Sequence, residues 1–337
     1  TVATPVSLDD VLADLNRVAV PIAPGAVPGT PSGVELAFRW EDEENDKETW
    51  VPQGLTGSAD ADASALVGGR RLALVSFYWN EDAAPNDPAK GVRLALVDIT
   101  NPNEPQYRFI LLVEPKAGPD WGIVDIHAGG IAWFGDYLYV ASTGSGLRVF
   151  DMRTIFQADT SMDLIGCDAT SCKAGLYKYV LPQVGRYQRV TTCDEPPIFS
   201  FVALDRSLVP PALVTGEYCS DTACAGPLNG RVFRYALDPA TGLLVGDQTF
   251  ARDAFYMGER QVQGAVSIGD IFFFSSSAPA GGAGALYRVE VGNSATFGWV
   301  DTPEDLMVDG ASSTLFGLSE GVGERVVFEA DLSGYQP

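Results

Sequence analysis

The chain has 337 residues, 46% of them hydrophobic, and carries 22 Lys and Arg against 44 Asp and Glu, a net charge of −22. This acidity argues against nucleic acid and anionic membranes as partners, because both would repel the protein, and no apolar run approaches the length that spans a bilayer. We expect a monomeric, folded protein whose partner is a small polar molecule or a glycan. One alternative is a local pocket of Arg and Lys that binds a single uronate or phosphate group.

The first 32 residues are predicted to form an arm outside the main domain. Residues 7–15 match a short helix, with Ser7 as the N-cap and acidic residues in the first turn. Residues 17–32 are rich in proline and glycine and are expected to be a linker. The remainder, 33–337, is predicted to be a single domain.

A five-residue phrase recurs five times after residue 50, and each copy opens a run of three or four short β-like segments. Repetition at this spacing is typical of a radial array of sheets. The copies start at Val51, His127, Phe199, Gln261 and Thr302. The third segment of each run alternates polar and apolar residues, as half-buried strands do. These third segments are 91–98, 146–151, 230–238, 284–290 and 323–329.

The predicted fold is all-β, a five-bladed β-propeller. The blades are expected at about 50–113, 124–182, 197–252, 260–301 and 302–332. The last blade has only three strands of its own, while a further strand-like segment, 33–41, precedes the first blade. We expect 33–41 to complete the last blade as its outer strand, because an open ring would expose edges that promote aggregation.

Four of the five cysteines form two pairs with the same short spacing, Cys167 with Cys172 and Cys219 with Cys224. No histidines lie near them to complete a zinc site, so two local disulfides are expected. Disulfides indicate an oxidising compartment, and with a chain that begins at Thr1 without a signal peptide they predict a mature, secreted protein. Cys193 is left as a buried free thiol or, less simply, an intermolecular partner.

One face of the predicted ring receives most of the long loops, and the functional site is expected there. These loops are 41–50, 78–90, 114–124, 183–197, 218–229 and 252–260. The opposite face keeps short turns, with 153–174 as its one long insertion.

Sugar recognition needs aromatic faces for stacking, together with carboxylates and a guanidinium for the hydroxyls. Residues of these types converge at the predicted mouth of the channel. The expected ligand-binding residues are Trp50, Gln53, Tyr78, Trp79, Trp121, Glu195, Glu259, Arg260 and Gln263. The alternative is that these side chains only satisfy channel waters and neighbouring strand ends.

The candidate catalytic residues are Asp125, His127 and Glu304. Asp125 and Glu304 would form the carboxyl pair that glycosidic cleavage requires, one protonated and one ionised. His127, the only histidine, is either a general acid or base or a hydrogen-bonded core residue. A single histidine excludes a multi-histidine zinc or iron centre.

No cofactor is expected. The acidic loops 41–48 and 81–87 offer oxygen ligands to Ca²⁺, but neither matches the EF-hand pattern, so a solvated acidic surface is the first interpretation and calcium the alternative. The chain has no nucleophile elbow, P-loop or dinucleotide fingerprint in a fitting context.

The predicted ring resembles the five-bladed architecture of furanosidase-type glycoside hydrolases and of tachylectin-type lectins. The Trp-x-Asn-Asp-Pro signature of one such hydrolase group is absent, and the blades differ too much to form five equal lectin sites. The resemblance implies a carbohydrate ligand but no specific family. Two functions therefore stay open: a secreted carbohydrate-active enzyme, either a glycoside hydrolase or a polysaccharide lyase, and a non-catalytic lectin-like module or interaction scaffold.

Overall fold

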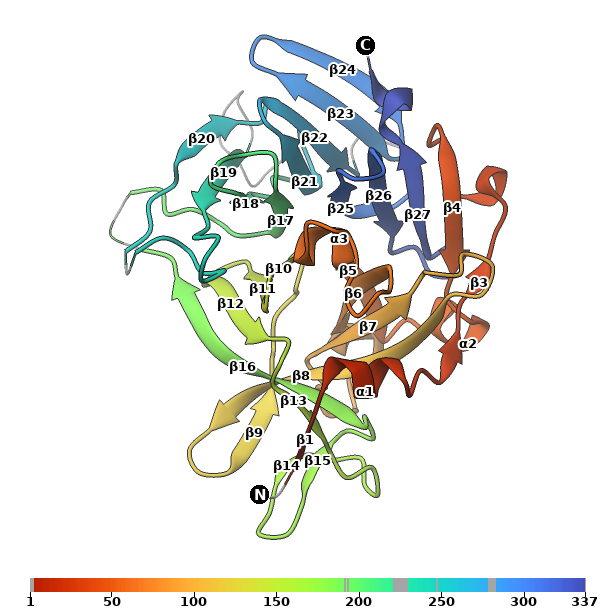
Figure 1. The fold of residues 1–337 in the computed structure, drawn as a ribbon, viewed down its shortest axis with the longest axis vertical. Helices are drawn as coiled ribbons and strands as arrows, with labels where there is room; N and C mark the ends of the chain where they lie inside the picture. The colour runs from red at the N-terminus through yellow and green to blue at the C-terminus, as the bar shows by residue number, and fades with distance from the viewer. Residues whose placement is uncertain are drawn as a thin grey trace.

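The computed structural model describes residues 3–190, 192, 194–220, 230–246, 248–277 and 283–336. Strands make up most of its regular structure, so the predicted all-β class is confirmed (Figure 1). Its helices are short: α1 (Leu8–Leu12), α2 (Asp42–Asn45), α3 (Ser58–Ala61) and the 3-10 turns η1 (Pro24–Ala26), η2 (Glu81–Ala83) and η3 (Leu332–Tyr335). None of the described helices has the length and apolar character needed to cross a bilayer.

The strands fall into successive antiparallel groups in chain order. The first two groups are β5 (Trp50–Gly57), β6 (Leu72–Trp79), β7 (Val92–Asp98) and β8 (Gln106–Lys116), then β10 (Ile131–Phe134), β11 (Tyr137–Ser142), β12 (Gly146–Asp151) and β16 (Tyr179–Gln188). The next two are β17 (Phe201–Asp205), β18 (Ala212–Gly216), β19 (Arg231–Ala236) and β20 (Asp253–Tyr256), then β21 (Val262–Ile268), β22 (Ile271–Ser276), β23 (Ala285–Glu290) and β24 (Asn293–Gly298).

The last group joins the two ends of the chain. It runs β25 (Pro303–Asp309), β26 (Thr314–Ser319), β27 (Val326–Asp331), β4 (Val34–Arg39) and β3 (Val20–Pro21). Strand β4 pairs antiparallel with β27, with Phe38 opposite Val327. The predicted pairing of the N-terminal strand with the last group is thus present, although β3 rather than β4 forms the edge.

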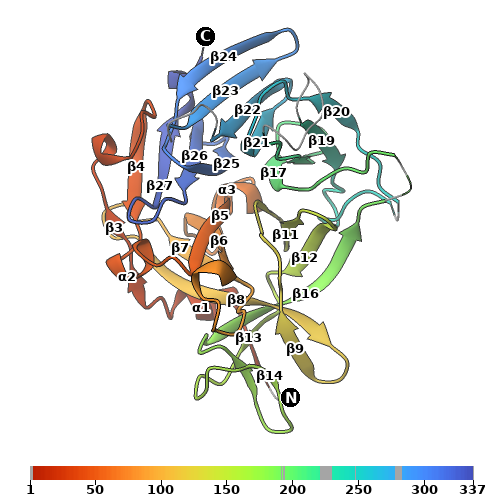
Figure 2. The ribbon, with the colours of Figure 1, turned by 180° about the vertical axis from the view of Figure 1, so that it is seen from behind.

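The first strands of the groups lie side by side around a centre. Strand β5 contacts β10 and β25, β10 contacts β17, and β21 lies between β17 and β25. The result is a nearly closed, barrel-like arrangement, with α3 over the middle in Figures 1 and 2. Apolar residues from facing sheets fill the spaces between the groups, including the fully buried aromatic residues Trp40, Phe77 and Tyr107.

The first two groups differ from the expected separate blades because they share one sheet. Strand β16 pairs in parallel with β8, with Tyr179 opposite Ile110. Shorter strands extend this sheet: β1 (Thr4–Val6), β2 (Arg17–Val18), β9 (Asp120–Ile123) and β13 (Ile155–Gln157). The hairpin β14–β15 (Ile165–Cys167 and Cys172–Ala174) lies beside β9 outside the ring (Figures 1 and 2).

Several segments predicted to be loops or linkers contain strands. Residues 114–124 belong largely to the β8–β9 hairpin, 183–188 continue β16, and 153–174 hold β13, β14 and β15. The linker 17–32 also contains β2 and β3. The cause is strand pairing, because each of these strands gains its backbone hydrogen bonds from a partner distant in sequence or from a hairpin.

The N-terminal helix forms as predicted, but ends at Leu12. Ser7 and Asp10 make a reciprocal capping box, in which the Asp10 amide donates to Ser7 Oγ at 3.1 Å and the Ser7 amide donates to Asp10 Oδ2 at 2.8 Å. Val11 and Leu12 are buried against the core. The arm is therefore packed on the domain.

Candidate functional site

Three copies of the repeated phrase place their third residue at a β-bulge. The register shifts between Pro52 and Leu55 in β5, between Val262 and Gly264 in β21, and between Pro303 and Leu306 in β25. The residues at these bulges are Gln53, Gln263 and Glu304. A bulge redirects one side chain of an otherwise regular strand, and here it does so at the same end of each inner strand.

The glycine after the bulge in β5 explains how closely the inner strands approach. A Cβ at Gly54 would lie 2.8 Å from the Ile131 amide nitrogen and 2.9 Å from the Gly130 carbonyl carbon. Only a residue without a side chain fits at this distance. The repeated phrase is therefore a packing signal as well as a strand signal.

Five polar residues from neighbouring strands and segments gather near the bulges of β5 and β25, and we name them the channel-mouth cluster: Gln53, Tyr78, His127, Glu304 and Glu320. Gln53 Nε2 donates to Glu320 Oε2 at 2.9 Å. The ring of Tyr78 lies over that of His127, with centroids 4.2 Å apart and a tilt of 32°. His127 precedes β10 in an irregular segment and is exposed.

The carboxyl groups of the channel-mouth cluster lie in a poorly solvated position. Burial raises the pKa of Glu304 well above its usual range, and the nearby Glu320 adds to this shift. Burial also raises the pKa of Glu320, and that of Tyr78 to about 12. Part of the His127 side chain reaches solvent, but the atoms packed around its ring still desolvate it and lower its pKa. The surroundings of the cluster therefore favour the neutral form of each of these side chains.

Other predicted residues lie outside this cluster. Asp125, Glu195 and Arg260 are exposed, and the Glu195 carbonyl accepts a hydrogen bond from Arg231 Nη1 at 3.2 Å. Gln263 Nε2 donates to Ser277 Oγ at 3.3 Å.

Glu259 and Trp121 are also apart from the channel-mouth cluster. Glu259 is half-buried, and burial raises its pKa. Trp121 is buried, and its Nε1 donates to the Lys173 carbonyl at 2.9 Å, which joins the β8–β9 and β14–β15 hairpins.

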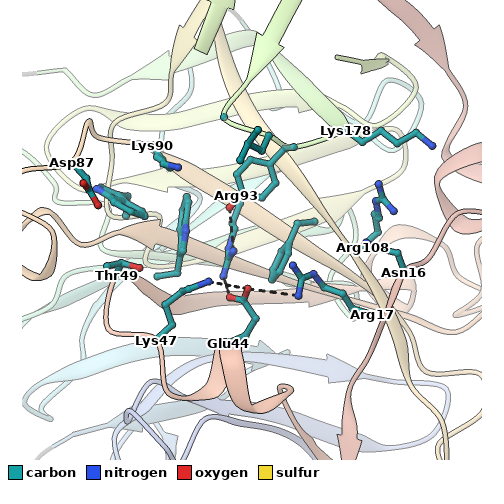
Figure 3. A pocket seen from close by; sticks show the side chains of 16 residues that line it. Asn16, Arg17, Glu44, Lys47, Thr49, Asp87, Lys90, Arg93, Arg108 and Lys178 are labelled. Atoms are coloured by element: carbon teal, nitrogen blue, oxygen red, sulfur yellow. Dashed lines mark hydrogen bonds and ion pairs between the residues drawn. The ribbon is translucent and has the colours of Figure 1, made fainter. Parts of the chain in front are cut away.

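Trp50 and Trp79 line a separate cavity of about 380 Å³, which we name the basic pocket (Figure 3). It lies at the predicted loops 41–50 and 78–90, beside residues 175–178 and the N-terminal arm. The two indole rings meet edge to face at 5.1 Å. Six basic side chains line this cavity: Arg17, Lys47, Lys90, Arg93, Arg108 and Lys178.

A buried carboxylate organises the floor of the basic pocket. Glu44, with a side chain 1% exposed, forms an ion pair with Arg93, lies 3.3 Å from Lys47 Nζ and lies 3.8 Å from Arg17 Nη1. Figure 3 shows these three cations meeting at Glu44. Their charges lower the pKa of Glu44 against the opposing effect of burial.

Arg93 is packed against aromatic rings. Its Cζ lies 3.7 Å from the centroid of the Phe109 ring and 4.4 Å from that of Trp50, and its Nη1 donates to Tyr177 Oη at 3.1 Å. Such stacking stabilises a buried guanidinium. Arg93 therefore fixes Glu44 and Trp50 in place.

Sequence reasoning missed Glu320, Glu44 and Arg93. Glu320 comes directly after β26 and is 16 residues from Glu304 in the sequence. Only the β25–β26 hairpin brings the two residues together. Glu44 belongs to an acidic run that was interpreted as a solvated surface, and Arg93 is an inward-facing residue of β7. The signal available for Arg93 was a charged residue inside an otherwise apolar strand.

The predicted disulfide between Cys167 and Cys172 is present and closes the β14–β15 hairpin. Cys224, of the second predicted pair with Cys219, and Cys193 lie outside the described residues. Within the described residues, no three His, Cys, Asp or Glu side chains are arranged to hold a metal ion. No known family model matches the chain, and no curated protein sequence matches it.

Proposed function

We propose that this protein is a secreted five-bladed β-propeller that binds a carbohydrate or another small polar ligand at the mouth of its central channel. The cyclic contacts among β5, β10, β17, β21 and β25 support the ring, and the pairing of β4 with β27 supports its closure. The disulfide between Cys167 and Cys172 supports an oxidising compartment.

The observation that carries the binding proposal is a buried acid with no protein partner. Glu304 is 3% exposed and its side chain makes no hydrogen bond to any described residue, yet its carboxyl oxygens are not fully enclosed and remain open to a water or a ligand. A buried carboxyl without a partner is costly, and proteins keep such groups mainly where a water or ligand completes the site. The Tyr78 hydroxyl beside it is likewise without a protein hydrogen bond in the described structure.

The chemistry of the channel-mouth cluster suits hydroxyl groups. Burial favours the protonated form of Glu304, and in that form the carboxyl both donates and accepts, as the Tyr78 hydroxyl does. The exposed face of His127 is a flat surface for C–H groups. Since burial disfavours charge in the cluster, an uncharged sugar or polyol fits it better than an ion.

Binding is tested by titrating the full chain with neutral oligosaccharides and following affinity by calorimetry. Tyr78→Phe removes one hydroxyl and keeps the ring on His127, so affinity should fall about fivefold to tenfold. Tyr137→Phe, on β11 away from the cluster, is the matched control and should bind normally. Binding that is equal in both variants would refute the site, and a screen in which no neutral glycan binds would refute the function.

Hydrolysis is the second candidate function, favoured by the proximity of two carboxyl groups, Glu304 and Glu320. The charge of Glu320 contributes to the raised pKa of Glu304, a relationship that suits one protonated acid and one carboxylate. Glu304→Gln should then abolish turnover of a glycan while the ligand still binds. A variant that retains turnover would exclude this pair from catalysis.

A further inference from the structure

The basic pocket is a cationic site in a strongly acidic protein, and it is distinct from the channel-mouth cluster. Six of the chain's 22 Lys and Arg line it, against two acids, Glu44 and Asp87. Glu44 is buried beneath Arg17, Lys47 and Arg93, while Asp87 is exposed. The lining therefore presents an excess of positive charge.

Apart from Glu44, the carboxylates that pair with these cations are not lining residues. Arg17 pairs with Glu41, Lys47 with Glu43 at 3.4 Å and Lys90 with Asp163 at 2.8 Å. Asp14 lies 2.7 Å from Lys178 Nζ and 3.4 Å from Arg108 Nη1. These acids hold the cations in position, and none of the four is among the residues that line the cavity.

Two lining residues hold a buried donor that has no partner in the described structure. They are Trp79, at Nε1, and Arg93, at Nε. Trp79 also carries Lys90 over its ring, with Nζ 5.6 Å from the centroid. An anionic ligand that contains a ring would engage all three features: the unpaired donors, the aromatic surface and the cationic rim.

We propose that the basic pocket binds a compact anionic group, a carboxylate or a phosphate, on a ligand whose ring packs against Trp50 and Trp79. Lys47 and Lys90 reach it from opposite sides (Figure 3), and Arg17 from the N-terminal arm completes the rim. Glu44 and Arg93 act as positioning residues, since they are 1% and 2% exposed and fix the loop that carries Lys47.

The test uses the full chain, with D-galacturonate and inorganic phosphate as anionic probes and D-galactose as the neutral one. Trp50 and Trp79 lie in the pocket, so tryptophan fluorescence reports on occupancy. At least one anion should bind saturably, and more weakly as salt is raised. Binding of galacturonate alone would identify the group as a carboxylate, and binding of phosphate alone as a phosphate.

The discriminating variant is Lys47→Ala combined with Lys90→Ala, which removes two partly exposed charges and leaves Glu44 and Arg93 paired. Anion affinity should fall by about tenfold or more, because charge-assisted contacts are lost. The matched control is Lys116→Ala with Arg153→Ala, which removes two charges outside the pocket and should leave affinity unchanged.

The proposal is overturned if neither anion binds, or if the Lys47 and Lys90 variant binds as tightly as the control. The neutral probe separates this site from the channel mouth. If galactose still binds the Lys47 and Lys90 variant, that binding belongs to the channel mouth. If galactose binds neither protein but an anion does, the anion site is supported and the neutral site is not.

Discussion

The Asp305 carboxyl group accepts a hydrogen bond from the backbone amide of Leu55 at 3.0 Å. The same oxygen, Oδ2, accepts from the Ile131 amide at 3.3 Å. Asp305 occupies the position in its copy of the repeated phrase that Gly54 and Gly130 occupy in theirs. One side chain of β25 thus binds the inner strands of two other groups.

Replacing Asp305 should reveal how much this connection stabilises the fold. Asp305→Ala leaves two buried amides without an acceptor, and the free energy of unfolding should fall by about 3 kcal/mol. Asp305→Asn keeps an oxygen in the same place and should cost clearly less. Urea denaturation of both variants measures the difference, and equal losses would show that the two hydrogen bonds contribute little.

Arg325 should couple stability to anion binding. It is fully buried, and its guanidinium donates to the carbonyls of Glu320, Glu44, Lys47 and Trp50. Arg325→Met keeps length but leaves those carbonyls unpaired, so we expect about 3 kcal/mol lower stability and weaker binding in the basic pocket. Arg252→Met, at an exposed arginine, is the control. Unchanged binding in a folded Arg325→Met protein would show that the loop carrying Lys47 keeps its position without Arg325.

Asp60 should make stability depend on pH. Burial raises its folded-state pKa to about 7, from 3.8. The folded protein therefore retains a proton that the unfolded chain loses, so this contribution to stability is greatest below pH 4 and decreases until about pH 7, by a total on the order of 4 kcal/mol.

Asp60→Asn removes this titration and keeps an acceptor for Thr56 Oγ1, which donates to Asp60 Oδ2 at 2.7 Å. The variant should match the wild type near pH 4 and be more stable at pH 8. Melting temperatures at both values measure this difference directly. A constant offset across the range would mean that Asp60 keeps an ordinary pKa.

Strand β4 should be essential to the last sheet. Phe38 is fully buried in the core, whereas Glu35 on the same strand is exposed. Phe38→Ala should lower the free energy of unfolding by about 3–5 kcal/mol, and Glu35→Ala should change it by less than about 0.5 kcal/mol. If both variants unfold like the wild type, β4 is not part of the cooperative unit.

Opening the disulfide should destabilise the β14–β15 hairpin, which precedes one border of the basic pocket. Cys167 and Cys172 are five residues apart, and the segment after β15 lines the pocket at Gly175–Lys178. Replacing both cysteines by serine should cost about 2 kcal/mol by loop-closure entropy. Thermal unfolding measures the cost, and a variant with unchanged stability would show that the β14–β15 pairing suffices to hold the hairpin.

Local pattern determined much of the fold. The alternation in 91–98, 146–151 and 284–290 predicts strands that are present as β7, β12 and β23, since a half-buried strand needs only a period of two to define its faces. The helix cap at Ser7 and the disulfide between Cys167 and Cys172 were also predictable, because each depends only on residues close together in the sequence.

Only the tertiary structure decided which charged residues meet. Glu44 and Arg93 are 49 residues apart, and each looks like a surface residue or an isolated charge in its own segment. The ion pair exists because α2 folds over β7 next to Trp50. In this low-dielectric setting, removing one charge would leave the other buried and unpaired at a high cost in stability. The parallel contact of β8 with β16 is equally invisible to local pattern, because strand pairing depends on partners that come together only in the folded chain.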